Sequence, residues 1–259
     1  MLINNKWDYP RLVEEIGDEV VWSPGSRYPD MDDPELMASG TTDSRGNRIG
    51  KWRIFSRRGG RLIEIGDYDS SGERTGTWKT SHPDSGVKGV GSYVQGKKNG
   101  PWKYFSSDYS GTPLCFGEYL NDKKTGTWIY NFEDTNRPQE MGSYLNGERT
   151  GVWKTFSSRG NILSEGEYNN GVKTGQPSSE GPTPARWQHW YRNLNKKKEG
   201  DYINGEKTGL WTRWYDDLRL KEQGHYSNGV KTGTWIEYAR RPNPDSSSDI
   251  LEKKQGEYI

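Results

Sequence analysis

The chain contains little of what an ordinary globular core is made from. Hydrophobic residues account for 29% of its 259 residues, and only 5 are phenylalanine. No apolar run approaches the roughly 18 residues by which a membrane-spanning helix is recognised. A composition this polar is typical of disordered chains, so a folded structure must draw its buried surface from another source.

Cysteine is nearly absent, and so is any excess of one charge. Cys115 is the only cysteine, which excludes an internal disulfide framework and suits a reducing compartment. Residues 1–7 lack the hydrophobic segment of a secretion signal, so we expect a cytoplasmic protein. With 37 basic and 36 acidic residues the net charge is +1, which gives no general attraction for nucleic acid. We therefore expect no nucleic-acid partner.

Signs of catalytic chemistry are also missing from the sequence. The histidines, His82, His189 and His225, are far apart, and none is paired with a motif serine or cysteine. Neither the spacing of zinc ligands nor a phosphate-binding Gly-x-x-x-x-Gly-Lys motif occurs. We expect no catalytic residue, no metal site and no cofactor, and we do not expect an enzyme.

What the chain does contain is a repeat built on aromatic residues and glycine. It has 12 Trp, 16 Tyr and 33 Gly, and a module of Gly-x-Tyr, a turn, and basic-x-Gly-x-Trp recurs about every 25 residues. The Gly-x-Tyr elements begin at Gly66, Gly91, Gly117, Gly142, Gly166, Gly200, Gly224 and Gly256. The Gly-x-Trp elements begin at Gly50, Gly76, Gly100, Gly126, Gly151, Gly209 and Gly233. A short fixed period predicts an array in which each unit packs mainly on its neighbours.

The residues within each repeat predict a β-hairpin. Residues 153–156 and 162–168 are short, rich in aromatic or β-branched residues, and bounded by Gly, Asn and Ser. Asn-Gly pairs such as Asn146-Gly147 stand between such segments and favour tight turns, because both residues tolerate a positive φ. No helical period is sustained. We therefore predict an all-β fold, an extended single-layer antiparallel sheet of consecutive hairpins over residues 40–259.

Alternation along each strand predicts aromatic residues on both faces of this sheet. The Trp and the residue two positions later share one face, and the residue three positions later lies on the other. The latter positions hold Phe55, Phe105, Phe156, Trp190, Trp214 and Tyr238. We expect aromatic contacts between strands to replace a thick aliphatic core.

Three stretches depart from the repeat. Residues 1–39 do not fit it, and we interpret them as an N-terminal cap that covers the first open sheet edge. The acidic residues 30–34 leave open a second interpretation, a partner-binding arm. Insertions near 176–186 and 239–252 are rich in Pro and Ser and predict surface loops.

The repeat resembles a known family. Residues 202–211, Tyr-Ile-Asn-Gly-Glu-Lys-Thr-Gly-Leu-Trp, and residues 226–235 resemble the MORN repeat in its bacterial variant form, and the resemblance covers roughly residues 40–258. The Tyr precedes the turn and the Trp follows it, which is similar to the YwqK-type antitoxin proteins. The resemblance implies a bacterial immunity protein or antitoxin that neutralises a cognate toxin by stoichiometric binding. Eukaryotic MORN proteins imply the alternative, a scaffold associated with anionic phospholipid or membrane-linked proteins.

In each Gly-x-Trp element a basic residue stands two positions before the glycine. Where the insertion near 176–186 interrupts the repeat, the equivalent basic residue stands two positions before Gly175. In the central repeats these basic residues are Lys98, Lys124, Arg149, Lys173 and Lys207. Stacked hairpins would align them in a row suited to an acidic partner or to anionic lipid headgroups. The alternative is that exposed turns simply tolerate Lys and Arg.

The densest aromatic cluster follows the insertion at 176–186. With the next repeat it comprises Arg186, Trp187, His189, Trp190, Tyr191, Trp214 and Tyr215. Trp, Tyr and Arg are favoured interface residues, and an insertion in a regular array often carries a binding loop. We predict the partner-binding site here, with ordinary packing between strands as the alternative. The oligomeric state is not predicted.

Overall fold

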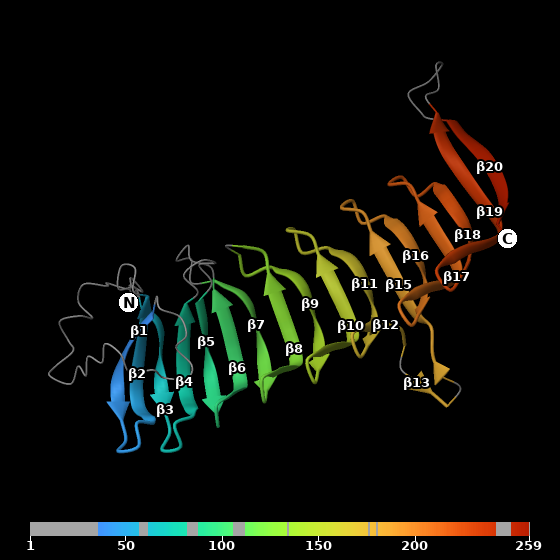
Figure 1. Ribbon diagram of the computed structural model, residues 1–259. Coiled ribbons are helices and arrows are strands. Elements are labelled where there is room, and N and C mark those ends of the chain that lie inside the picture. Colours follow the sequence, from blue (N-terminus) through green and yellow to red (C-terminus); the bar gives the residue numbers. More distant parts are fainter. Residues whose placement is uncertain are drawn as a thin grey trace. The chain divides into compact units, whose positions relative to one another are not determined.

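The computed structural model describes residues 36–56, 62–81, 88–105, 112–133, 135–175, 177–179, 181–241 and 250–258. These residues form strands, turns and bends, and consecutive strands lie side by side within each part of the molecule (Figure 1). The strands pair antiparallel, which confirms the predicted all-β fold of an open sheet built from hairpins. No described segment is a helix long and apolar enough to cross a membrane. Residues 1–35 of the predicted cap lie outside the described residues.

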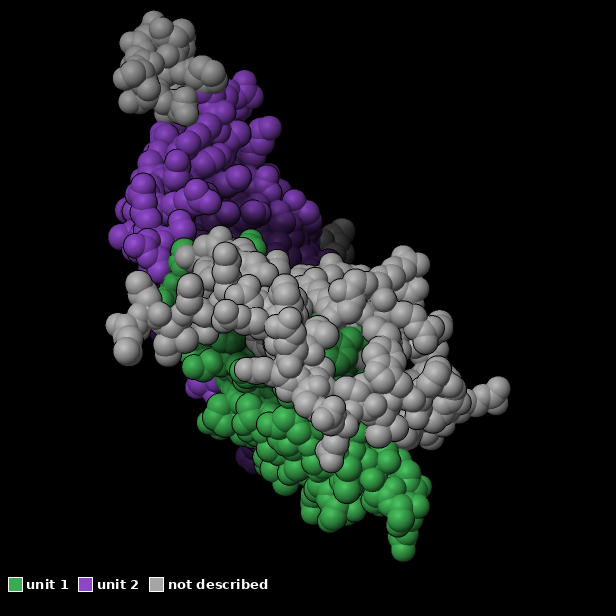
Figure 2. Space-filling model, turned by 90° about the vertical axis from the view of Figure 1, so that its left-hand side faces the viewer, with its two compact units in different colours: residues 1–125, 131–136 green, residues 126–130, 137–259 purple. Residues whose placement is uncertain are grey.

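The chain divides into two compact units, coloured separately in Figure 2. Unit 1 comprises residues 1–125 and 131–136, and unit 2 comprises residues 126–130 and 137–259. The division falls within a single strand, β8 (Lys123–Asn131).

The described residues of unit 1 form seven complete strands, each paired with the strand that follows it as far as β7. They are β1 (Leu36–Thr42), β2 (Arg48–Ser56), β3 (Leu62–Tyr68), β4 (Arg74–Ser81), β5 (Lys88–Val94), β6 (Lys97–Phe105) and β7 (Pro113–Leu120). The repeat pattern of the structure thus begins at Leu36, within the stretch interpreted as a cap.

Unit 2 follows the same plan from β9 to β20, with one interruption. Its strands before the interruption are β9 (Pro138–Leu145), β10 (Glu148–Phe156), β11 (Ile162–Asn169) and the short β12 (Val172–Lys173). After it come β15 (Ala185–Trp190), β16 (Lys196–Ile203), β17 (Glu206–Trp214), β18 (Leu220–Ser227), β19 (Val230–Arg241) and β20 (Ile250–Tyr258).

The insertion near 176–186 interrupts one strand without breaking the array. β11 pairs first with β12 and then, past the insertion, with β15, so the two segments together form one return strand. The insertion carries its own small hairpin, β13 (Pro177–Ser178) and β14 (Gly181–Pro182), where the composition predicted only a loop. The Gly175 amide and the Thr174 hydroxyl both donate to the Thr183 carbonyl, at 2.8 and 3.0 Å, and close its base. Of the insertion near 239–252, residues 242–249 lie outside the described residues.

The Asn-Gly turns adopt the predicted conformation. Asn146 has φ of 52° and Gly147 has φ of 92°, as a two-residue hairpin turn requires. The turn glycines also bond to the preceding hairpin, because their amides donate to carbonyls there. These bonds are Gly171 to Arg149 at 2.9 Å, Gly205 to Lys173 at 3.0 Å and Gly229 to Lys207 at 3.0 Å.

The core of each unit is a single line of alternating Trp and Tyr side chains, which we call the aromatic ladder. In unit 1 it runs through Trp52, Tyr68, Trp78, Tyr93, Trp102 and Tyr119. In unit 2 it runs through Trp128, Tyr144, Trp153, Tyr168, Trp187, Tyr202, Trp211, Tyr226, Trp235 and Tyr258. Successive rings meet edge to face, a geometry worth about 0.5–1.5 kcal/mol per pair beyond the area buried. The ladder therefore supplies the buried surface that the aliphatic residues do not.

The glycine of Gly-x-Tyr makes room for the ladder tryptophan of the paired strand. A Cβ atom at Gly200 would lie 2.2 Å from Cδ2 of Trp211, and the same close approach recurs at Gly66, Gly91, Gly142, Gly166 and Gly224. The Trp211 indole N–H donates to the Asp201 carbonyl, one residue past that glycine, at 3.1 Å. The ladder tryptophans that pack against these glycines lie flat across the neighbouring strand, and each is at most 4% exposed.

Candidate functional site

The basic residues of the repeat lie over the tryptophan rings of the ladder. Lys207 Nζ is 4.8 Å from the centre of the Trp211 ring, and Arg149 Cζ is 3.9 Å from that of Trp153. The same contact between a basic side chain and a Trp ring joins Arg48 with Trp52, Arg74 with Trp78, Lys98 with Trp102, Lys173 with Trp187 and Lys231 with Trp235. Lys124 occupies the equivalent sequence position before Trp128. The basic residues thus form a row on the ladder, held by cation–π contacts rather than extended from free turns.

Three cations of this basic row are also paired with a carboxylate from the strand that bears the matching glycine. Glu64 accepts from Arg74 at 2.6 Å, and Glu140 accepts from Arg149 at 2.5 Å. Glu222 lies 3.5 Å from Lys231. Each of these glutamates stands two residues before the glycine of its Gly-x-Tyr element, so the repeat has a defined place for a neutralising carboxylate.

The aromatic cluster predicted as a partner site does not form one surface. Trp187 is a ladder residue, 4% exposed, and its indole donates to the Glu167 carbonyl at 3.3 Å. His189 stacks on it on the same face, with ring centres 6.2 Å apart. Arg186 and Trp190 alternate with them along β15 and therefore belong to the opposite face.

The two tyrosines of the predicted cluster lie in the return turns between hairpins. The Tyr191 hydroxyl donates to the Trp214 carbonyl at 3.0 Å, and the Tyr215 hydroxyl donates to the Tyr238 carbonyl at 2.5 Å. Arg240 covers the Tyr215 ring at 4.2 Å. Both tyrosines join one hairpin to the next, so their contacts are those of packing within the array.

Positive charge accumulates on the ladder face near β15, β16 and β17. Burial, then the charges of Lys207 and Arg213, lowers the pKa of Lys198. Burial, followed by Lys198, Lys173 and other cations, lowers the pKa of His189 to about 4. Burial contributes most to both shifts, and the neighbouring cations add to it.

The opposite face carries positions that differ from repeat to repeat. From β10 to β20 the residue before each ladder Trp, or after each Gly-x-Tyr glycine, forms a cross-strand row that we call the variable row. Its members are Val152, Glu167, Arg186, Asp201, Leu210, His225, Thr234 and Glu257. Val152 is 55% exposed and Leu210 is 44% exposed. Because its side chains differ from repeat to repeat and are exposed at Val152 and Leu210, this row is a candidate contact surface.

Two features of the array were not predicted from the sequence. Trp52 packs on Gly40, which takes the place of a Gly-x-Tyr glycine although Thr42 stands where the Tyr would be. Leu194 and Leu218 take the left-handed position in two return turns, with φ of 71° and 68°, where Gly160 stands in another. The signal for Gly40 was its distance from Gly66, which is close to the repeat length.

The described residues offer little to a metal or a covalent mechanism. No group of three His, Cys, Asp or Glu side chains among them is placed to hold a metal ion. Burial raises the pKa of the Cys115 thiol, which makes its thiolate scarce at neutral pH.

Comparison with known proteins does not identify a relative. No protein-family model and no curated protein sequence matches the chain.

Proposed function

We propose that this chain binds a protein partner through the variable row and neutralises a bacterial toxin by doing so. The observation that carries the proposal is the division of labour between the two faces. The ladder face repeats the same Trp, Tyr and basic residues, whereas the variable row changes between apolar, acidic, basic and neutral side chains. Constant positions hold a repeat array together, and exposed positions that vary can recognise a specific partner.

The toxin as partner is proposed from the resemblance of the repeat to YwqK-type antitoxin proteins. A stoichiometric inhibitor needs a broad complementary surface and no chemistry of its own. The exposed apolar residues Val152 and Leu210, with Arg186 between them in the row, provide anchors of the kind that interfaces use. Arg186 is held by Asp201 at 3.0 Å, so its guanidinium is positioned before a partner arrives.

Association with anionic phospholipid is the second candidate for this chain. The basic row was the sequence feature behind it, and in the structure that row packs on the tryptophan rings. Arg74, Arg149 and Lys231 are further neutralised by glutamates. This arrangement favours the protein partner over the lipid surface.

The experiment is an affinity capture of the tagged protein from its host, with charge introduced into the variable row. We expect a single dominant protein partner, toxic when expressed alone, that is lost on the double substitution Val152→Glu and Leu210→Glu. Val230→Glu is the matched control, because Val230 is 61% exposed but lies beside an Asn-Gly turn. Co-expression should rescue growth for the wild type and Val230→Glu only.

Two results would overturn the proposal. One is full retention of the partner by the doubly substituted protein, which would remove the variable row from the interface. The other is recovery of anionic vesicles in a flotation assay with no protein partner, which would support the lipid candidate.

A further inference from the structure

In β16 of unit 2 the charge of the neutralising carboxylate is reversed. The position two residues before the Gly-x-Tyr glycine holds Glu140 in β9 and Glu222 in β18, each facing a basic residue of the row. In β16 the same position holds Lys198, beside Lys207. No carboxylate among the described residues lies within ion-pair distance of either lysine.

The register places a second cation, Arg213, and the imidazole of His189, which is neutral at pH 7, directly across from Lys198. His189 on β15 and Arg213 on β17 are its cross-strand partners, on the same face of the sheet. Like charges directly opposite each other destabilise a sheet, so this arrangement costs stability. The buried Nε2 atom of His189 has no hydrogen-bond partner, and Lys173 adds its charge from the neighbouring β12.

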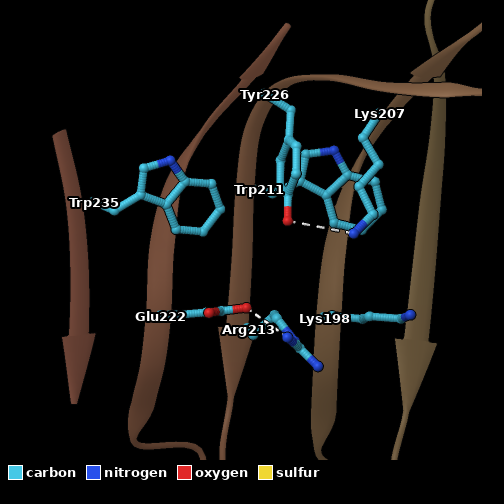
Figure 3. Close-up of a pocket in the computed structure, with 7 residues that line it drawn as sticks. All are labelled: Lys198, Lys207, Trp211, Arg213, Glu222, Tyr226 and Trp235. Atoms are coloured by element: carbon cyan, nitrogen blue, oxygen red, sulfur yellow. Dashed lines mark hydrogen bonds and ion pairs between the residues drawn. The ribbon is translucent and has the colours of Figure 1, made fainter. Parts of the chain in front are cut away.

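A small cavity lies where the missing carboxylate would be. Its volume is about 60 Å³. Its lining consists of Lys198, Lys207, Trp211, Arg213, Glu222, Tyr226 and Trp235 (Figure 3).

Figure 3 shows the aromatic rings and Lys207 in one row, and Lys198, Arg213 and Glu222 in a second row beside it. Glu222 already accepts from Arg213 at 2.6 Å and lies near Lys231, so it leaves Lys198 and Lys207 uncompensated.

We propose that this cavity binds a single oxyanion, a carboxylate or a phosphate group, between Lys198 and Lys207. The ligand oxygens would take the place that a glutamate carboxylate takes in β3, β9 and β18, and Arg213 would add a third cation. A volume of about 60 Å³ has room for one such small group. The site lies on the ladder face, so the proposal does not depend on the partner that the variable row binds.

The test is an NMR titration of the purified protein with sodium acetate and, separately, with inorganic phosphate, at constant ionic strength set with NaCl. We expect saturable shifts of the Trp211 indole N–H and of the Lys198 and Lys207 side-chain signals. Saturation by acetate alone identifies a carboxylate site, and saturation by phosphate alone identifies a phosphate site. Either result supports an oxyanion site.

Lys198→Glu is the decisive variant, because it gives β16 the glutamate that β9 and β18 carry at this position and should fold at least as well. It reverses one charge beside the cavity and should weaken oxyanion binding by about a hundredfold, roughly tenfold for each unit of charge. Lys103→Glu makes the same change of net charge at an exposed position of unit 1 and should bind as the wild type does. Absence of saturable shifts from both anions, or equal affinity in Lys198→Glu, would overturn the proposal.

Discussion

The glycine beneath each ladder tryptophan gives the sharpest test of how this array is held together. Gly200 has no strained backbone angle, so alanine would ordinarily be favoured there by about 0.5–1 kcal/mol for its lower conformational entropy. The close approach predicts the opposite sign. A methyl group at Gly200 would lie 2.2 Å from the Trp211 ring, whereas carbon atoms in contact need about 3.5–4 Å.

The cost of Gly200→Ala can be worked out from the contacts that the ring would lose. Displacing an indole that is 2% exposed is an overpacking change of about 1–3 kcal/mol. Moving it also breaks the bond from the indole N–H to the Asp201 carbonyl, 3.1 Å long, which is worth about 0.5–1.5 kcal/mol. After the entropy gain we expect a net loss of about 2 kcal/mol in the free energy of unfolding.

Gly256 supplies the matched control. It occupies the same motif position in β20, but the nearest atom to a Cβ there is Tyr258 Cε2 at 3.9 Å, which is ordinary contact. Gly256→Ala should therefore be neutral or more stable by about 0.5 kcal/mol. Urea unfolding followed by circular dichroism, with hydrogen exchange at the Trp211 indole, compares the two. Equal stability of Gly200→Ala and Gly256→Ala would refute the role given to the close approach.

Three further changes test other parts of the structure. Trp187→Ala removes a buried ladder residue and should cost about 3–5 kcal/mol in thermal denaturation, so a variant of wild-type stability would contradict its place in the core. Leu218→Gly should raise stability by about 1 kcal/mol by relieving a left-handed backbone, as should Leu194→Gly, and a lower melting temperature for both would count against strain there. Burial and then nearby lysines, led by Lys198, lower the pKa of His189 to about 4, so the folded protein binds fewer protons there than the unfolded chain. Stability should therefore fall by about 3 kcal/mol as the pH drops from about 6.5 to 4, and urea titrations of His189→Gln should lack that loss.

The hairpins could be predicted because their signals are local. Asn146-Gly147 specifies its turn through the φ angles of two adjacent residues, and alternation alone places Trp187 and His189 on one face. The roles of single side chains within the array were harder to assign. The sequence marks Lys173 as basic, but its position over the Trp187 ring depends on a strand that resumes only after the insertion.

The predicted partner cluster shows what the density of aromatic residues does not determine. The density of aromatic residues suggested one surface around Trp187, yet Arg186 and Trp190 belong to the other face, as alternation along the strand already indicated for Trp190. Whether an aromatic residue is core or contact is decided by the glycine on the paired strand, here Gly166. That pairing spans the insertion and is not visible from local composition.

The turn hydrogen bonds have a consequence for the chemical ageing of this protein. Asn-Gly is a sequence prone to deamidation, because the glycine amide nitrogen can attack the asparagine side chain and close a succinimide ring. In the folded array the amides of Gly171, Gly205 and Gly229 each donate to a carbonyl of the preceding hairpin. These hydrogen bonds keep the glycine nitrogen from attacking the asparagine side chain. The same Asn-Gly pairs become reactive once a hairpin detaches from the preceding hairpin. Deamidation at Asn170, Asn204 and Asn228 would thus record how often each hairpin has opened.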